Sequence, residues 1–463
     1  MKRYSLTTGY WLLVAVATLA QGPLTPPGPP GPTYKTLQQV EPRTPISALP
    51  VTISQPGSYY LTTNLTSATT GITIAASGVT LDLMGFELAG VPGSAGILVS
   101  GSRTNLAIRN GTVRNSGSNG VNAFNASNGQ YQDLRLSANA GAGLSCGLNS
   151  TVINCTASSN TGHGIDTGED STVSGCAAYN NTGDGIDTGS GTTVSGCAAR
   201  SNGGAGIDTG EGCTVSGSAA RLNTGSGIST GDGSLVSGCS ANTNTVHGIT
   251  ADNGTTIKDC TVQLNQQRGI SVGSGCAVTG CAAYINQGDG INMGDGGTVK
   301  DCAARSNAGN GISTGNDCTI TGCSARRNDG SGIVTAGGDT VSDCSAGFNG
   351  VHGIVVDTGC QVRDNDCAAN GRLLTGYGIS ATGGANRIDD NNVIGNFVGI
   401  VCSAAGNIII RNTARANGVN ANYSIVAGNA VGVIVAAPAS GAINGNTGGG
   451  GVGSTDPWAN FSY

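Results

Sequence analysis

The residues of this sequence best suited to chemistry are acidic and recur at a fixed interval. Asp166, Asp187 and Asp208 each follow an Ile, and 21 residues separate each from the next. Asp184 lies two residues before the Ile of its own unit, on the same edge of the pattern. If equivalent residues stack as neighbouring strands, these carboxylates lie about 5 Å apart, where like charges repel unless they are solvated, protonated or bridged by a cation. The row therefore predicts a solvated acidic stripe, a cation site or a catalytic pair.

Two kinds of chemistry fit such a row. Hard oxygen ligands suit Ca²⁺, which is the one cofactor that the sequence indicates. The calcium-ligand candidates are Asp166, Asp187, Asp208, Glu169 and Glu211. Two carboxylates across a groove suit hydrolysis of a glycosidic bond. The candidates for catalysis are Asp166, Asp184, Asp187, Asp208 and, in an assisting role, His163. The solvated stripe stays open beside both, because the three units are nearly identical and recent repeat duplication explains them.

The three histidines share one column of the pattern. His163, His247 and His352 each lie two residues before an Ile, four and five repeats apart. Stacked strands at the usual spacing would separate successive histidines by about 19 and 24 Å. They are therefore too far apart to share a metal ion, and ordinary turn variation accounts for the column.

A 21-residue repeat supplies the elements that position these side chains. Gly-Ile recurs every 21 residues from Gly164 to Gly353, and the unit Gly185–Ala205 reads GIDTGSGTTVSGCAARSNGGA. Looser units precede this run, and others follow a four-residue insertion around Arg372 to Thr375. Self-similarity at a fixed period is the mark of a solenoid. The repeat predicts about sixteen coils and a body about 75 Å long.

Three apolar columns indicate three short strands in each unit. Ile165, Val173 and Ala178 head columns of β-branched or small residues, and apolar residues alternate with polar ones at the period of a strand. Gly, Asn and Asp between the columns are turn formers. We therefore expect an all-β parallel β-helix in which each strand pairs with its equivalents in the neighbouring coils.

An asparagine column is the most specific structural signal. Asn occupies every 21st position from Asn139 to Asn370, and Asn396 and Asn417 continue the column after the insertion. Asn tolerates a left-handed backbone at a bend, and its amide can bond to the amide of the next coil. The column predicts a structural ladder.

The sixteen cysteines also fall into columns. One column runs from Cys155 to Cys344, with Ser218 in its single gap, and a second includes Cys213 and Cys360. Parallel side chains on stacked strands give poor disulfide geometry, and free Cys packs as a small hydrophobe. We expect a mostly reduced interior ladder; some disulfides remain an alternative, and no Cys-x-x-Cys pair points to metal.

The two ends of the chain differ in composition from the repeat. Residues 1–20 read as a signal peptide, with Lys2 and Arg3 before an apolar run too short to span a bilayer. Residues 21–50 form a Pro/Gly-rich linker and lead-in, 51–440 the β-helix, and 441–463 a Gly-rich tail with an aromatic end. The expected location is therefore secreted or cell-surface, extracellular or periplasmic, without a transmembrane segment after cleavage.

Composition excludes several kinds of partner. The net charge is −6 and the isoelectric point is about 5.0, so nothing favours nucleic acid or an anionic membrane. Charged residues make up 10% of the chain, against about 25% in an average globular domain, and 80 residues are Gly. A polysaccharide or cell-surface glycan is the partner class left open.

Stacked Gly-Ile strands with an asparagine column resemble the right-handed parallel β-helix superfamily that includes pectate lyases and polygalacturonases. Residues 52–88 and 456–463 resemble the first and last segments of secreted bacterial β-helix repeat proteins. The resemblance covers nearly everything after Leu49 and implies the handedness of the coil. Gly162-His163-Gly164 matches a polygalacturonase element, but the Asn-Thr-Asp, paired-Asp and Arg-Ile-Lys elements of that family are missing.

The resemblance leaves two classes of function. A pectate-type lyase needs a basic group beside the carboxylates, and the first on that edge is Arg268, three coils beyond Asp208. We therefore expect an exported structural, adhesive or carbohydrate-binding β-helix protein. The alternative is a polysaccharide-active enzyme, a hydrolase or lyase of pectin-like substrates.

Overall fold

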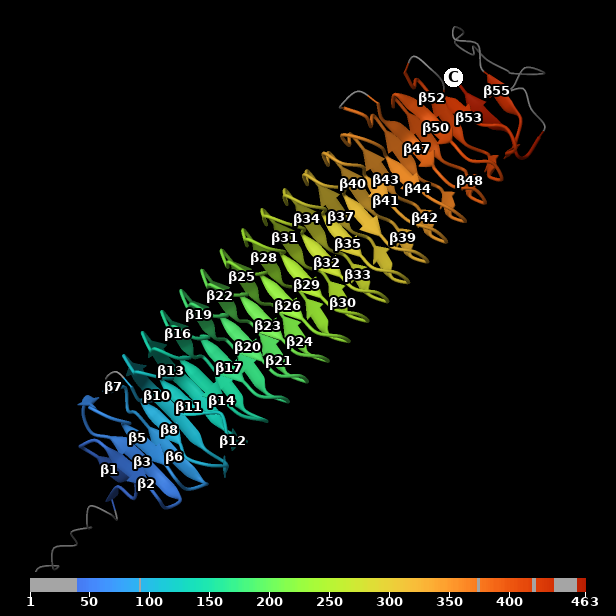
Figure 1. The fold of residues 1–463 in the computed structure, drawn as a ribbon. Coiled ribbons are helices and arrows are strands. Elements are labelled where there is room, and N and C mark those ends of the chain that lie inside the picture. The colour runs from blue at the N-terminus through green and yellow to red at the C-terminus, as the bar shows by residue number, and fades with distance from the viewer. Residues whose placement is uncertain (1–39, 91–92, 373–374, 419–421, 437–455) are drawn as a thin grey trace, which may run out of the picture. The chain divides into compact units, whose positions relative to one another are not determined.

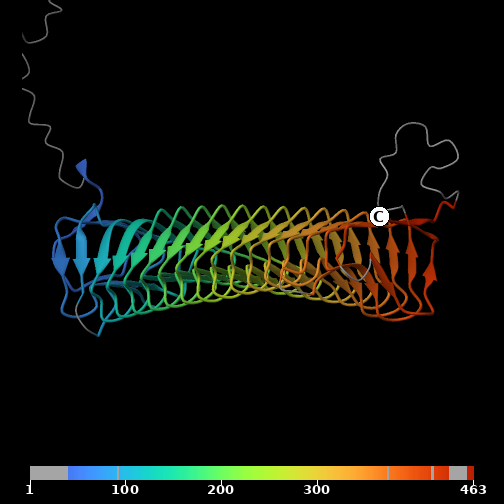
Figure 2. The ribbon, with the colours of Figure 1, turned by 90° about the horizontal axis from the view of Figure 1, so that it is seen from above.

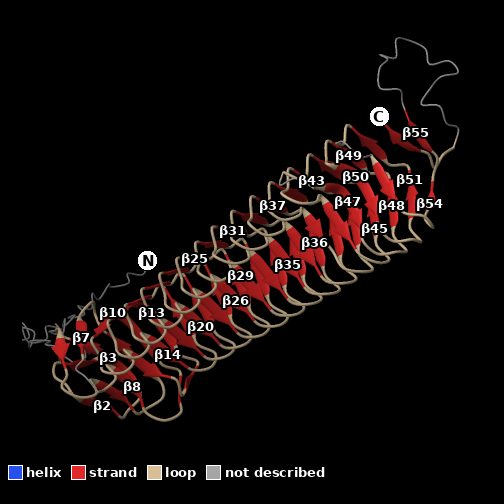
Figure 3. Cartoon of the chain, turned by 45° about the horizontal axis from the view of Figure 1, so that its top comes forward, coloured by secondary structure: helices blue, strands red, loops and turns tan. Residues whose placement is uncertain are grey.

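The computed structural model of this chain describes residues 40–90, 93–372, 375–418, 422–436 and 456–463. The chain divides into two units, Met1–Arg43 and Thr44–Tyr463. The predicted signal peptide and residues 21–39 of the predicted linker lie outside the described residues. All strands of the described residues belong to the second unit, in which Figure 3 shows strands and loops.

Each regular coil contains three short strands joined by bends, and successive coils stack in chain order (Figure 1). In the regular coils each strand pairs in parallel with its equivalent 21 residues further on, as Ile165 with Ile186 and Val173 with Val194. The interval is longer where a coil carries extra residues, as between Ile354 and Ile379. The predicted parallel β-helix is confirmed.

The first strands of the coils form one sheet of eighteen strands, here called sheet B. Its members are β2 (Val51–Ile53), β5 (Ile72–Ile74), β8 (Ile97–Val99), β11 (Val121–Ala123), β14 (Leu144–Cys146), β17 (Ile165–Thr167), β20 (Ile186–Thr188), β23 (Ile207–Thr209), β26 (Ile228–Thr230), β29 (Ile249–Ala251), β32 (Ile270–Val272), β35 (Ile291–Met293), β38 (Ile312–Thr314), β41 (Ile333–Val334), β44 (Ile354–Val356), β47 (Tyr377–Ala381), β50 (Val398–Cys402) and β53 (Tyr423–Ile425).

The second and third strands form sheet A, with 36 strands among the described residues. The second strands are β3 (Gly57–Leu61), β6 (Val79–Asp82), β15 (Thr151–Ile153), β18 (Thr172–Ser174), β21 (Thr193–Ser195), β24 (Thr214–Ser216), β27 (Leu235–Ser237), β30 (Thr256–Lys258), β33 (Ala277–Thr279), β36 (Thr298–Lys300), β39 (Thr319–Thr321), β42 (Thr340–Ser342), β45 (Gln361–Arg363), β48 (Arg387–Asp389), β51 (Ile408–Ile410) and β54 (Ala430–Val431). The third strands are β4 (Leu65–Thr66), β7 (Glu87–Ala89), β16 (Thr156–Ser158), β19 (Ala177–Tyr179), β22 (Ala198–Arg200), β25 (Ala219–Arg221), β28 (Ser240–Asn242), β31 (Thr261–Gln263), β34 (Ala282–Tyr284), β37 (Ala303–Arg305), β40 (Ser324–Arg326), β43 (Ser345–Gly347), β46 (Asp366–Ala368), β49 (Asn392–Ile394), β52 (Thr413–Arg415), β55 (Ile434–Ala436) and β56 (Asn460–Ser462). Two long strands, β10 (Ala107–Arg114) and β13 (Gln130–Ser137), span both positions, and β1 (Thr44–Ile46) pairs with β3. A separate pair, β9 (Arg103–Thr104) and β12 (Ala126–Ser127), forms a two-stranded sheet.

The solenoid has about eighteen turns, close to the sixteen expected. Figure 2 shows the turns stacked in chain order along the solenoid. The two additional turns lie where the Gly-Ile motif is missing, at Val51 and at Tyr423. No helix of the described residues is long and apolar enough to cross a membrane.

The core is a set of apolar columns that run along the solenoid. Ile165, Val173 and Ala178 are fully buried, and so are their equivalents in the next coils. Burying each Ile or Val stabilises the fold by about 1.5–3 kcal/mol relative to exposing it. Side chains alternate between the two faces of a strand, so a three-residue strand has either its middle residue or its two end residues facing solvent. In β17 the middle residue, Asp166, faces solvent and both neighbours are buried.

The predicted asparagine ladder is confirmed, and its role is to satisfy backbone groups at a bend. The Oδ1 of Asn265 accepts hydrogen bonds from the backbone N and the Nδ2 of Asn244, at 3.0 Å each. The Nδ2 of Asn244 also donates to the carbonyl of Ala220. The same pattern passes from Asn370 to Asn396 and on to Asn417, across the insertion. The ladder therefore pairs polar groups that have no water available to them.

The sixteen cysteines are all free and buried, in the columns that the sequence predicts, and the reduced state of the ladder stays a prediction. Their columns do more than fill space. The backbone N of Cys155 donates to the Sγ of Cys176, whose thiol donates to the carbonyl of Ser174. Ser218 makes the same two contacts in the gap of the column, and Asn365 receives the N–H of Cys344 at its end. Small size and hydrogen-bonding capacity together explain which residues occupy the column.

Candidate functional site

The acidic row lies on the outward face of sheet B. Asp166, Asp187 and Asp208 occupy the middle positions of β17, β20 and β23, and they are in-register neighbours across the parallel strands. The buried Ile and Thr on either side fix each strand, so the middle side chain has to point outward. One coil earlier, the Oγ of Ser145 donates to a carboxylate oxygen of Asp166 at 2.8 Å.

His163 joins this row from the bend before β17. Its Nδ1 lies 3.1 Å from Oδ2 of Asp184, and its Nε2 lies 3.8 Å from Oδ2 of Asp187. The same Nδ1 lies 3.2 Å from the backbone N of Asp184. The two contacts of Nδ1 are alternatives: without a proton it accepts from the amide, and with a proton it donates to the carboxylate. His163 is therefore hydrogen-bonded to Asp184 in either protonation state, through the backbone amide or through the carboxylate.

The column of His163 has a structural role throughout the solenoid. The Nδ1 atoms of His247 and His352 accept from the backbone N of Arg268 and Tyr377 in the next coil. Asp184 accepts from the N of Ala205 through Oδ1 in the same way, at 2.5 Å. What sets His163 apart is the pair of carboxylates at its ring nitrogens.

Burial and charge shift the pKa values of the cluster in different directions. The hydrogen bond with Asp184 raises the pKa of His163, against the effect of burial. Burial raises the pKa of Asp187 to about 6, and repulsion from Asp166 and Asp208 adds to the shift while His163 opposes it. Burial also raises the pKa of Asp208.

The pKa of Asp184 shifts in the opposite direction to those of Asp187 and Asp208 because its hydrogen bonds outweigh the effect of burial. Burial acts to raise the pKa of this carboxyl, but the bonds from His163 and Ala205 outweigh it and lower the pKa. By contrast, burial lowers the pKa values of His247 and His352. Of the three histidines, His163 is thus the one tuned toward its charged form, beside a carboxyl tuned toward its neutral form. Groups with opposed shifts of this kind are suited to proton transfer.

The residues that can hold a metal ion are fewer than the sequence candidates. Ligand atoms of His163, Asp184 and Asp187 all lie within 4.8 Å of one another. Among the described residues, Glu169 and Glu211 are not part of that group and lie exposed on the bend after sheet B. One imidazole nitrogen with two carboxylates suits Zn²⁺ or Mn²⁺ better than Ca²⁺, which prefers oxygen ligands alone.

A second copy of this edge, five coils further on, carries different side chains. Arg268 and Asp289 stand 105 residues after His163 and Asp184, with Arg268 Nε 3.8 Å from Oδ2 of Asp289. Asn292 stands where Asp187 would recur. The copy thus supplies its own cation and fewer carboxylates, so the acidic cluster is particular to the first copy.

Sequence columns brought together Asp166, Asp187 and Asp208 but missed two features of the site. Ser145 was missed because its coil lacks the Gly-Ile motif, although it shares the column of Asp166. The contact of His163 with Asp187 was missed because it crosses from one column to another. A spacing of 24 residues, one coil of 21 plus three residues along the chain, is the signal that would have found it.

These coils, sheets and ladders define the chain as a parallel β-helix protein. The model of the family described as "Right handed beta helix region" matches residues 70–220, 151–297 and 273–415. These matches together span residues 70–415, and the chain belongs to this family. A comparison with curated proteins finds no match.

Several solved structures share the fold. A mannuronan C-5 epimerase A-module from Azotobacter vinelandii is 17% identical, with 81% of this chain and 90% of that chain covered and a TM-score of 0.29. The pectate lyase Pel9A is 16% identical over 50% of this chain and 71% of that chain, with a TM-score of 0.28. The receptor-binding domain of the siphovirus 9NA tailspike is 10% identical over 90% of this chain and 77% of that chain, with a TM-score of 0.33. At these identities the likeness concerns the fold alone.

Proposed function

We propose that this chain is an exported carbohydrate-binding β-helix protein whose sheet B wall holds a glycan. One observation carries the proposal: the outward position of sheet B is polar and partly exposed on eight successive coils. Its residues are Asp166, Asp187, Asp208, Ser229, Thr250, Ser271, Asn292 and Ser313. Hydroxyl, carboxylate and amide groups repeat there at about 4.8 Å, and each can hydrogen-bond to sugar hydroxyls. Many weak contacts along one polymer add up to useful avidity. Export itself rests on the N-terminal sequence.

The binding test compares matched sets of acids on one chain. Asp166→Asn, Asp187→Asn and Asp208→Asn together remove the charge of the sheet B row. Asp259→Asn, Asp301→Asn and Asp343→Asn remove the same charge from exposed bends, where the left-handed backbone suits Asn. In pull-downs with a panel of insoluble uronate and neutral polysaccharides, the first set should lower glycan retention and the second should not. Equal retention by both sets would contradict the proposed binding wall.

A second function, polysaccharide degradation, is favoured by the His163–Asp184–Asp187 cluster, with the pKa of Asp187 at about 6. In this role the cluster would move a proton at the glycosidic oxygen or the sugar ring. Reducing-sugar release and absorbance at about 235 nm, the unsaturated-product band of β-elimination, test it on the same polysaccharides. If the chain degrades a polysaccharide and Asp187→Ala abolishes this activity, the chain is an enzyme and the binding-only function is wrong. Inactivity on every polymer, with glycan retention intact, supports binding.

Metal binding is tested separately through thermal stability. We expect Zn²⁺ or Mn²⁺ to raise the melting temperature relative to chelator, and His163→Asn to remove the rise while keeping a hydrogen-bond acceptor for the backbone of Asp184. If millimolar Ca²⁺ leaves the melting temperature where the chelator does, the calcium hypothesis is dropped. If all three ions do so, the site holds no metal.

A further inference from the structure

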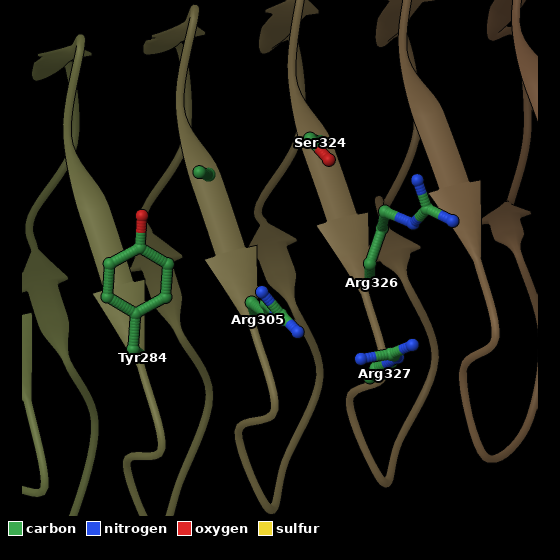
Figure 4. Close-up of a pocket in the computed structure, with 6 residues that line it drawn as sticks. Tyr284, Arg305, Ser324, Arg326 and Arg327 are labelled. Atoms are coloured by element: carbon green, nitrogen blue, oxygen red, sulfur yellow. The ribbon is translucent and has the colours of Figure 1, made fainter.

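A second wall of the solenoid gathers aromatic and cationic side chains. Tyr284, Arg305 and Arg326 end the third strands of three successive coils, and they are in-register neighbours across β34, β37 and β40. With Arg327 and Ser324 they line a hollow of about 460 Å³, which Figure 4 shows from the outside. A neighbouring hollow of about 350 Å³ shares Tyr284 and Arg305. The two form one shallow groove along the solenoid axis.

The arginines of this groove lack acidic partners. In the part of the chain that the structure describes, Arg305, Arg326 and Arg327 make no ion pair. Eight other arginines do form ion pairs with acidic residues: Arg43, Arg109, Arg114, Arg268, Arg363, Arg372, Arg387 and Arg411. Cations stacked at about 4.8 Å repel each other. The chain has more acidic than basic residues, with a net charge of −6, yet none of its acids neutralises these arginines within the described residues. An anionic ligand between the guanidinium groups would remove the repulsion.

The groove is partly organised before any ligand arrives. The Cζ of Arg326 lies 5.2 Å from the centre of the Phe348 ring, which limits the freedom of that guanidinium. Ala303 and Ser324 form a low floor between the long side chains. A guanidinium offers two parallel N–H donors to a carboxylate or sulfate, and the Tyr284 ring offers a flat apolar face with a polar tip. Such a surface suits a sugar ring that carries an anionic group.

The same three residues occur a second time on this wall. Tyr179, Arg200 and Arg221 stand 105 residues earlier, in the same order and in register. They are exposed, and neither arginine makes an ion pair within the described residues. Five coils separate the two triads by about 24 Å. A linear polymer that reaches both gains avidity that a short oligomer does not.

We infer that this wall, centred on Tyr284, Arg305 and Arg326, binds acidic polysaccharides, and that Tyr179, Arg200 and Arg221 form a second subsite for the same polymer. The inference rests on the proposed carbohydrate-binding function and adds to the sheet B wall a second binding surface, on sheet A, with its own ligand class. It assigns the anionic groups of the polymer to the arginines and its sugar rings to the tyrosines.

The test measures binding of the full chain to polygalacturonate, dextran sulfate and neutral dextran. Arg305→Gln with Arg326→Gln removes two charges from the groove, and Lys258→Gln with Lys300→Gln removes two from the neighbouring strands β30 and β36 as a matched control. The arginine pair should weaken binding of an acidic polymer about tenfold, and the lysine pair less than about twofold. Added Arg200→Gln and Arg221→Gln should cost more affinity with long polymers than with short oligomers. Unchanged melting temperatures verify that these exposed substitutions leave the fold intact.

The outcomes separate the inference from the function on which it rests. A chain that binds none of the polymers contradicts carbohydrate binding itself, and the inference with it. Binding that is equal for neutral dextran and both acidic polymers, or equal for the two double variants, contradicts only the inference. The response to polygalacturonate against dextran sulfate tells whether carboxylate or sulfate is the preferred group, and either result supports the acidic class.

Discussion

At the residue scale, one position of the repeat, two residues before the Ile, holds side chains of very different chemical character. His163, Asp184, His247 and His352 all accept a backbone N–H from the next coil, so the fold needs only an acceptor there. Their surroundings then decide the chemistry. Asp184 and Asp187 favour the charged imidazole of His163, whereas burial beside Tyr377 disfavours it in His352. A residue can thus serve the fold and remain available for proton transfer.

Replacing Asp187 should stabilise the fold by an amount that depends on pH in a defined direction. The pKa of Asp187 is about 6 in the folded chain against 3.8 ordinarily, so the folded chain binds this proton more tightly than the unfolded chain. The ionised carboxylate therefore destabilises the fold above about pH 6, and the penalty fades as pH falls toward about 4. Because the side chain is 36% exposed, solvent screening reduces the expected gain of Asp187→Asn to about 1 kcal/mol near neutral pH.

Urea denaturation at about pH 8 and about pH 4 measures this difference. The gain in stability from Asp187→Asn should be present at the higher pH and absent at the lower one. The control Asp301→Asn, on an exposed bend, should give no gain at either pH. An NMR titration gives a second readout, since loss of the Asp187 charge should lower the pKa of His163. A gain that is the same at both pH values would contradict the raised pKa of Asp187.

At the element scale, the coil is held by polar ladders as much as by its apolar columns. A three-residue strand is too short to pair all of its polar groups, and each bend leaves backbone N–H groups inside the solenoid. Asn, Cys, Ser and Thr side chains accept these N–H groups one coil away, as Ser171 does for Ser150. The bends themselves require a left-handed backbone, with φ of 54° at Asp170 and 57° at Asn180. The left-handed residue comes directly before the ladder asparagine, as Asn180 comes before Asn181, so two different residues meet the two demands.

Removing one ladder asparagine should therefore be costly. Asn244→Ala takes away the Oδ1 that accepts from Asn223 and the Nδ2 that donates to Ala220 and Asn265. Leaving these buried groups unpaired should destabilise the fold by about 2–4 kcal/mol. Thermal melting, with Asn242→Ala as the control two residues away on the outward face, measures the effect. Equal shifts for the two variants would show that the ladder adds nothing beyond the strand.

At the scale of the whole solenoid, stability depends on its ends, because every inner coil is covered on both sides. The described C-terminal segment supplies such a cover. Strand β56 pairs with β52 and β55, and the Oδ1 of Asn460 accepts from the backbone N of Asn412 at 2.9 Å, extending the ladder that starts at Asn365. Terminal repeats of solenoids commonly have this protective role.

Deleting residues 456–463 should uncover this end. The unpaired edge of β52 and the open asparagine ladder would offer a template to other chains, so we expect a lower melting temperature and self-association. Calorimetry and light scattering measure the two effects. Asn460→Ala should reproduce part of the loss of stability, and Trp458→Ala, at an exposed side chain, should not. A truncated chain that melts like the parent and stays monodisperse would contradict the role of β56 as a cap.

The sequence by itself determined the architecture, because neighbours in this fold are separated by a constant number of residues. A column with a period of 21 residues is a line of contacts, so Ile165 with Ile186 and Asn244 with Asn265 could be read directly. Where the motif weakens, near both ends, two turns were missed. The candidate site could be read only along its column, as the row Asp166, Asp187 and Asp208.

The tertiary structure alone decided which columns meet. The contact of His163 with Asp187, the floor that Ala303 and Ser324 give to the groove beside Arg305, and the docking of β56 all depend on how side chains of different columns meet. The repeat period fixes distances along the solenoid axis, whereas distances around each coil depend on bend geometry and rotamers. The acidic row thus came from the sequence, and its partnership with a histidine came from the fold.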